Sequence, residues 1–143
     1  MAYQANTIAK YIINYCNEKG IPISNLKLQK LLYFAWVEYY KKTRQELFHD
    51  DICAWQLGPV IPDVYFEYCA FGGKTINRMY GVDLEKPDKS TIDSFLNNYT
   101  QLSASALVDK SHAKGSAWDV VYKQGVGNKD LIPHDLIILT ECQ

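Results

Sequence analysis

Several classes of protein are excluded by what this sequence lacks. It has no segment approaching the ~20 apolar residues of a membrane-spanning helix, no internal repeat and no low-complexity tract. Residues 1–10 contain no apolar run of signal-peptide length. The 15 Lys and Arg residues nearly balance the 16 Asp and Glu residues, for a net charge of -1, so there is no general attraction for a phosphate backbone. We expect a cytoplasmic protein with neither a membrane nor a nucleic-acid partner.

Patterns that bind metal or form disulfides are missing as well. The four cysteines form no C-x-x-C pair, and His49, His112 and His134 are far apart in the sequence. A metal site needs several His, Cys or carboxylate ligands that converge, whereas His49-Asp50-Asp51 alone is typical of a solvated turn. We expect free thiols in a reducing compartment, no metal and no other cofactor.

What the chain does contain is typical of one folded domain. Hydrophobic residues make up 48% of its 143 positions and charged residues 22%, a balance found in globular proteins. No linker divides the sequence, so we expect a single domain over residues 1–143. Aromatic residues, at 13%, suit both a core and a contact surface.

Apolar periodicity predicts a mainly α fold, a compact helical bundle around one central helix. A first helix is expected from about Thr7 to Lys19, and a second, capped by Ser24 or Asn25, up to about Lys42. The second helix is apolar around most of its circumference. Only a narrow strip is expected to stay polar, formed by Lys27, Lys30, Glu38 and Lys41. Such a helix must be surrounded by other elements, so we place it at the centre.

The apolar period shortens to two after the central helix. Residues 47–49 and 52–57 predict a small antiparallel β-hairpin, which Gly58-Pro59-Val60 should end because proline donates no ladder hydrogen bond. A third helix is expected from Pro62 to Gly72-Gly73, and its inward side chains are expected to be Val64, Tyr65, Tyr68 and Cys69.

The second half of the chain predicts shorter elements. Residues 74–87 are expected to form a loop with at most one strand. Further helices are expected from Asp88 to Asn98, from Ser103 to about His112, after a capping box at Ser116 and Asp119, and from Pro133 onward.

Of the titratable groups, His112 is the best candidate for catalysis, because it closes a predicted helix shortly before Trp118. A histidine in that position can equally cap helix carbonyls. The cysteines lie on or beside apolar faces, where inert thiols are usual. An enzyme that uses His112 with a cysteine or a carboxylate is therefore the weaker alternative, and we expect no catalytic residue.

Two side-chain groups on the central helix have a structural and a binding interpretation. A basic ridge of Lys27, Lys30, Lys41, Lys42 and Arg44 fits a solvated helix face better than a nucleic-acid site. The aromatic stripe of Tyr33, Trp36 and Tyr40 either fills the core, which we favour, or lines a groove for a partner. The same choice applies to Trp55, Tyr65 and Trp118.

Two motifs follow each other in a recognisable order. The first is Leu26-Lys27-Leu28-Gln29-Lys30-Leu31-Leu32-Tyr33-Phe34-Ala35 in the central helix. The second combines Ala54-Trp55, Gly58-Pro59-Val60 and Pro62-Asp63-Val64-Tyr65, and the His112–Trp118 pair is a less specific addition. In this order and spacing they resemble the SocA-like family of antitoxins, also called Panacea domains, over roughly Asn6 to Ile138.

The resemblance implies an antitoxin of a phage-associated toxin–antitoxin system, which neutralises a co-encoded toxin by direct protein–protein binding. One branch of the family resembles proteolytic adaptors that deliver their toxin to a protease, and this is the main alternative. The candidate toxin-binding or family-motif residues are Lys30, Tyr33, Trp55, Tyr65, His112 and Trp118.

Overall fold

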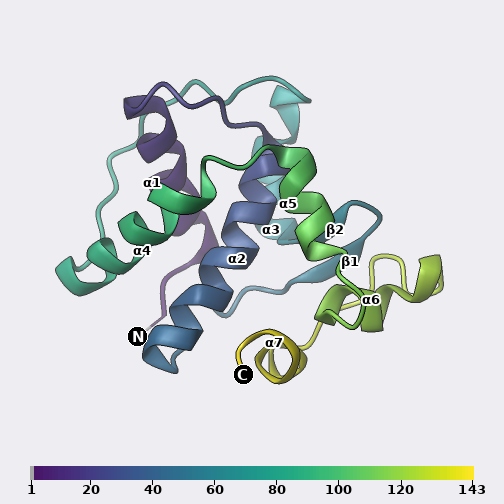
Figure 1. Ribbon diagram of the computed structural model, residues 1–143. Helices are drawn as coiled ribbons and strands as arrows, with labels where there is room; N and C mark the ends of the chain where they lie inside the picture. The colour runs from purple at the N-terminus through teal and green to yellow at the C-terminus, as the bar shows by residue number, and fades with distance from the viewer. Residues whose placement is uncertain (1) are drawn as a thin grey trace.

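The computed structural model describes residues 2–143, which form seven α-helices and a small antiparallel sheet (Figure 1). In chain order the elements are α1 (Ala5–Glu18), α2 (Asn25–Thr43), β1 (Cys53–Trp55), β2 (Gly58–Val60), α3 (Pro62–Tyr68), η1 (Cys69–Phe71), α4 (Lys86–Tyr99), α5 (Ala104–Ser111), α6 (Ala117–Tyr122), η2 (Lys123–Gly125) and α7 (His134–Glu141). The predicted mainly α fold with a small hairpin is confirmed.

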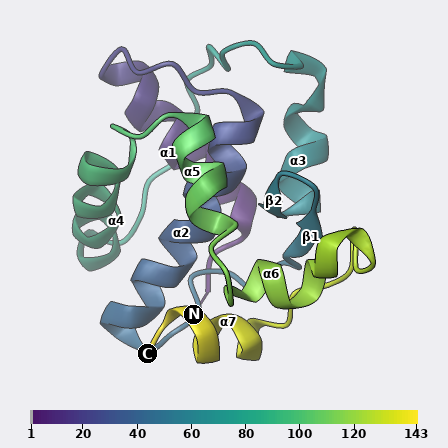
Figure 2. The same ribbon diagram turned by 45° about the vertical axis from the view of Figure 1, so that its right-hand side comes forward.

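Helix α2 is the centre of the fold, as predicted from its apolar circumference. The Ser24 hydroxyl accepts a hydrogen bond from the Lys27 amide and so caps the N-terminus of α2. At its other end Arg44 adopts a left-handed conformation with φ of 61°. The helix packs against α1, α3, α4, α5, α7 and β2. Figures 1 and 2 show these elements around it, with α1 and α4 on one side and the hairpin on the other.

The aromatic stripe of α2 belongs mainly to the core. Tyr33 is 1% exposed and Trp36 is fully buried, while Tyr40 is half-buried and stacks on Trp36. The Trp36 indole donates to the carbonyl of Phe48 at 2.9 Å, which ties the segment after α2 to the helix. The favoured interpretation of the stripe as core packing is therefore confirmed.

Both chain ends lie near the C-terminal end of α2 (Figure 2). The Tyr3 amide donates to the carbonyl of Leu47, and the Arg44 guanidinium donates to the carbonyl of Cys142 at 3.1 Å. None of the helices within residues 2–143 combines the length and the apolar character that crossing a bilayer requires.

The predicted hairpin is present, and its predicted strand 52–57 contains β1, but the partner of that strand is 58–60 and not the predicted 47–49. Strand β1 pairs with β2, in the register Cys53 with Val60 and Trp55 with Gly58, whereas Phe48 forms only an isolated bridge to Tyr3. Gly58-Pro59-Val60 is thus a strand and not a strand breaker. Pro59 is tolerated because it lies opposite Ala54, whose amide and carbonyl bond to residues 129–130 instead.

The expected inward position of Cys69 is also wrong. Cys69 is exposed, because α3 ends at Tyr68 and the chain continues as the 3-10 helix η1, which turns the thiol outward. The loop expected after the third helix is confirmed, since no helix or strand forms between residues 74 and 85; within it Ile76 is buried and its amide donates to the carbonyl of Ile23. Helix α4 starts at Lys86, two residues before its predicted start at Asp88.

Candidate functional site

Lys30 has the least expected position among the six predicted residues, because its side chain is completely buried. Its ammonium donates to the carbonyl of Pro59 in β2 at 2.8 Å, and it forms no ion pair within residues 2–143. Its predicted place on the polar strip of the central helix is therefore wrong, since that part of α2 faces β2 and α5 rather than water. Burial lowers the pKa of Lys30 from 10.5 to about 7, because desolvation penalises the charged form.

This burial also removes the predicted basic ridge. Lys30 points inward, and the Lys27 ammonium donates to the carbonyl of Thr100 at 2.9 Å. The Arg44 guanidinium is engaged with the carbonyl of Cys142 and lies over the ring of Tyr40. No continuous basic face is left on α2 for a phosphate backbone.

Gly58 allows the hairpin to approach Lys30 closely. A Cβ at this position would lie 2.5 Å from the Ser111 hydroxyl and 2.8 Å from Cε of Lys30, and its φ is +112°. Only glycine avoids both the steric overlap and the backbone strain. The turn into β2 is thus held between α2 and the C-terminal end of α5.

His112 and Trp118 join the same buried region. His112 is the C-cap of α5, and its ring stacks on the Trp118 indole at 3.8 Å between centroids and 10° between planes. The Trp118 indole N–H donates to the carbonyl of Trp55 at 2.7 Å, which fixes α6 to β1. Burial lowers the pKa of His112, and the nearby charge of Lys30 lowers it further.

Two polar atoms in this interior have no hydrogen-bond partner among the described residues: the hydroxyl of Tyr33 and Nε2 of His112. Burial raises the pKa of Tyr33, and the charge of Glu141 adds to the effect. The hydroxyl is therefore neutral at all ordinary pH values. Unpaired buried polar atoms cost stability, so this interior is less well satisfied than the rest of the core.

The arrangement needed for catalysis by His112 is not formed in the described part of the chain. None of the described hydrogen bonds joins the imidazole to a cysteine or a carboxylate, as a nucleophile–base or base–orienter pair requires. Burial also raises the pKa of the Cys53 and Cys142 thiols, and that of Cys16 to about 11, which disfavours the nucleophilic thiolate. Within residues 2–143 no three His, Cys, Asp or Glu side chains gather into a site that could hold a metal ion.

Trp55 and Tyr65, in contrast, are only half-buried, and they line a groove of about 340 Å³. The groove runs between the start of α2, the hairpin turn and α3, and its apolar walls include Leu26, Leu57 and Val60. Among the described residues, those that line it include no Asp, Glu, Lys, Arg or His. It is therefore an uncharged recess that an apolar group can enter with little desolvation of charge.

An aromatic cluster borders this groove. The rings of Trp55 and Tyr65 meet edge to face at 4.8 Å, and Phe66, which is 63% exposed, packs against both. Leu57, at the tip of the hairpin, is 52% exposed. Exposed aromatic and aliphatic side chains that gather beside a recess are typical of protein contact surfaces.

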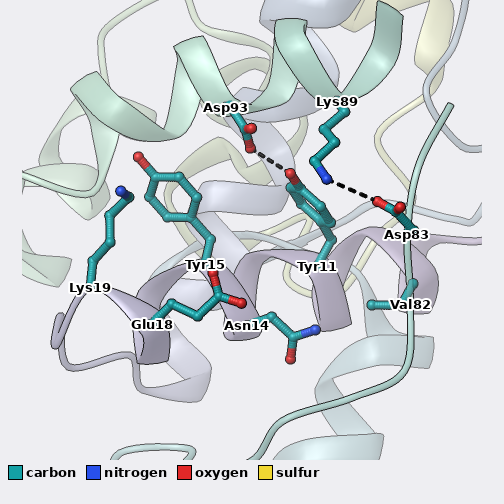
Figure 3. A pocket seen from close by; sticks show the side chains of 9 residues that line it. All are labelled: Tyr11, Asn14, Tyr15, Glu18, Lys19, Val82, Asp83, Lys89 and Asp93. Carbon is teal, nitrogen blue, oxygen red and sulfur yellow. Dashed lines mark hydrogen bonds and ion pairs between the residues drawn. The ribbon is translucent and has the colours of Figure 1, made fainter. Parts of the chain in front are cut away.

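A second groove, of about 390 Å³, lies between α1, α4 and the loop before α4 (Figure 3). In it the Tyr11 hydroxyl donates to Asp93 at 2.6 Å, and the Lys89 ammonium donates to Asp83 at 3.4 Å. Four of its polar side chains are thus already paired with one another, and none of the six predicted residues lines it. We therefore regard the hairpin groove as the better candidate site.

The structure thus separates the six predicted residues into two places. Lys30, Tyr33 and Trp118 are buried, His112 caps the buried region, and only Trp55 and Tyr65 line the groove. Sequence analysis did not single out Leu57, Phe66 and Gln56. The alternation of residues 52–57 placed Leu57 on the same face as Trp55, and this was the only signal for it.

The family described as "Antitoxin SocA-like, Panacea domain" matches residues 28–119. This chain belongs to the SocA-like antitoxin family. The protein named antitoxin SocA from Caulobacter vibrioides (strain NA1000 / CB15N) is 35% identical over 130 residues, which cover 82% of this chain and 69% of that relative. No solved structure matches the chain.

The family predicted from the two motifs is therefore confirmed. In this SocA-like domain, the matched region begins in α2 and ends at Asp119 in α6. It contains all six predicted residues and also Leu57 and Phe66. The buried polar region around Lys30, Tyr33 and His112 thus lies within the part of the chain that matches the family, and so do the residues that line the hairpin groove, except Asn25 and Leu26.

Proposed function

We propose that this protein is an antitoxin that neutralises a co-encoded toxin by direct protein–protein contact. The observation that supports this most directly is the 35% identity to antitoxin SocA over 82% of the chain. The uncharged groove beside exposed Leu57 and Phe66 is consistent with a contact surface. We further propose that neutralisation involves no chemical step, because His112 has no cysteine or carboxylate partner among the described residues.

Co-expression with the product of the neighbouring gene tests the proposal. We expect that product to arrest growth when expressed alone, and this protein to restore growth and to co-purify with it as a stable complex. A destabilised variant of the same length serves as the negative control. If growth is not restored and no complex forms, the proposed function is wrong.

The lifetime of the toxin separates direct blocking from delivery to a protease. Blocking predicts that the toxin half-life after a synthesis stop is unchanged or longer when the antitoxin is present. A shorter half-life would instead support the proteolytic adaptor. We also propose that the protein acts in the cytoplasm, where its four free thiols would remain reduced.

A further inference from the structure

The hairpin groove is a pre-formed recess and not a gap in a loose loop. Polar side chains from two helices hold the strands that line it. The Lys30 ammonium donates to the Pro59 carbonyl, the Ile61 amide donates to Gln29 at 2.9 Å, and the Trp118 indole donates to the carbonyl of β1. A recess that is rigid before binding loses little conformational entropy when a partner enters it.

Much of the groove wall is apolar or aromatic, beside the uncharged amide side chains of Asn25, Gln29 and Gln56. Leu26, Val60 and the rings of Trp55 and Tyr65 line it, and Leu57 extends from the hairpin turn with half of its surface exposed. Such a recess accepts one or two apolar side chains, because these displace water from apolar walls without removing a charge from solvent.

One cation lies beside Trp55, which is one of the residues that line the groove. The Lys129 ammonium is 5.6 Å from the centroid of the Trp55 ring, and among the described residues it takes part in no ion pair. Its backbone is fixed in position, since its amide donates to the carbonyl of Ala54 and its φ is +71°. An uncharged recess with one unpaired cation at its edge is complementary to an apolar residue that has a carboxylate close by.

We propose that this groove is the toxin-binding site, and that it seats an apolar side chain of the toxin while a neighbouring toxin carboxylate pairs with Lys129. This inference rests on the proposed antitoxin function. It identifies Leu57 and the Trp55–Tyr65 pair as the centre of the contact and Lys129 as its charged edge.

The test measures the affinity of the purified neighbouring-gene product for variants of this protein. Leu57→Asp should weaken binding by about 30-fold or more, because it places a charge at the tip of the apolar recess. Phe66→Asp, on α3, should act in the same direction. Leu139→Asp is the matched control, since Leu139 is 66% exposed and lies on α7, away from the groove. The affinity of this variant for the neighbouring-gene product should stay within about twofold of that of the wild type.

The charged edge is tested separately with salt. Lys129→Glu should weaken binding about tenfold at low ionic strength, and Lys129→Gln should reduce the salt dependence of the dissociation constant. Thermal melting of each free variant confirms that the fold is retained. Unchanged salt dependence in Lys129→Gln would overturn the acidic part of the proposal.

The outcomes distinguish this inference from the proposed function. If the wild-type protein does not bind the neighbouring-gene product at all, the antitoxin proposal fails. If the wild type binds but Leu57→Asp and Phe66→Asp bind equally well, only the assignment of the groove is wrong. If the wild-type protein is a dimer that Leu57→Asp converts to a monomer, the groove contacts a second copy of this chain, and the toxin-binding assignment is also overturned.

Discussion

Replacing Lys30 by methionine should change the stability of this protein in opposite directions at low and high pH. The side chain is fully buried, it has no carboxylate partner within residues 2–143, and burial lowers its pKa from 10.5 to about 7. At ~1.4 kcal/mol for each pKa unit, burial of the charged ammonium lowers the unfolding free energy by up to about 5 kcal/mol. Methionine has a similar length and carries no charge, so it removes this penalty.

The direction follows from which state binds the proton. Above pH 10.5 the lysine is neutral in both states and there is no penalty. Between about 7 and 10.5 the unfolded chain binds a proton that the folded protein does not, so the unfolding free energy rises with pH. Below about 7 both states are protonated, and the folded state carries the full penalty.

The substitution also removes one hydrogen bond. The Pro59 carbonyl would lose its donor at 2.8 Å, at a cost of ~1–3 kcal/mol that does not depend on pH. Lys30→Met should therefore stabilise the protein by ~2–4 kcal/mol near pH 6 and destabilise it by ~1–3 kcal/mol above pH 10.5.

Urea unfolding followed by tryptophan fluorescence at several pH values measures this crossover. Lys27→Met is the matched control on the same helix, because it removes a hydrogen bond to a backbone carbonyl from a partly exposed lysine. It reports the cost of the lost bond without the burial of a charge. A stability difference between Lys30→Met and the wild type that is the same at every pH would refute the reasoning.

Three other substitutions test the packing of the hairpin and the cap of α2. Gly58→Ala should destabilise the protein by ~3 kcal/mol or more in thermal melts, since its Cβ would lie 2.5 Å from the Ser111 hydroxyl at φ of +112°. Gly20→Ala is the control: its φ is +69° and nothing lies within 4 Å of the added Cβ, so it should cost only ~1 kcal/mol. Trp118→Phe removes the N–H that donates to the carbonyl of Trp55 and should lower the unfolding free energy by ~1–3 kcal/mol; an unchanged urea midpoint would contradict this. Ser24→Ala removes the cap of α2 and should cost ~1 kcal/mol, with Ser24→Asp retaining most of the stability.

The helices were largely predictable because their signals are local. The second helix was expected to begin at a Ser24 or Asn25 cap and to reach Lys42, and α2 spans Asn25–Thr43 with Ser24 as its cap. Pro133 was expected to open the last helix and is the N-cap of α7. Periodicity and capping depend on residues a few positions apart, and these are visible in the sequence.

The hairpin shows why local signals fail for strands. Three residues with a proline at the centre, 58–60, have weak strand propensity, yet they form β2 because Pro59 faces a partner that already bonds elsewhere. A proline can enter a strand where the opposite residue needs no hydrogen bond from its backbone nitrogen. That condition is set by residues 129–130, which are remote in the sequence.

For the candidate site, the sequence identified motif residues but could not tell which of them lie at the accessible groove and which lie in the core. The sequence identified Trp55 and Tyr65 as candidate contact residues, and both line the groove. It also selected Lys30 and Tyr33, which are buried in the folded protein, so a partner cannot reach them without opening the core. Motif positions within a family combine residues of the core and of the surface, and only coordinates separate the two.

The sequence by itself determined the family, the helical class and the central place of α2, because an apolar circumference can be satisfied only by surrounding elements. The tertiary structure alone decided which polar side chains enter the interior and where the accessible groove lies. Lys30 meets Pro59 across 29 residues, and Trp118 meets Trp55 across 63. Contacts over such separations depend on how the helices pack together, and no local pattern of residues records that packing.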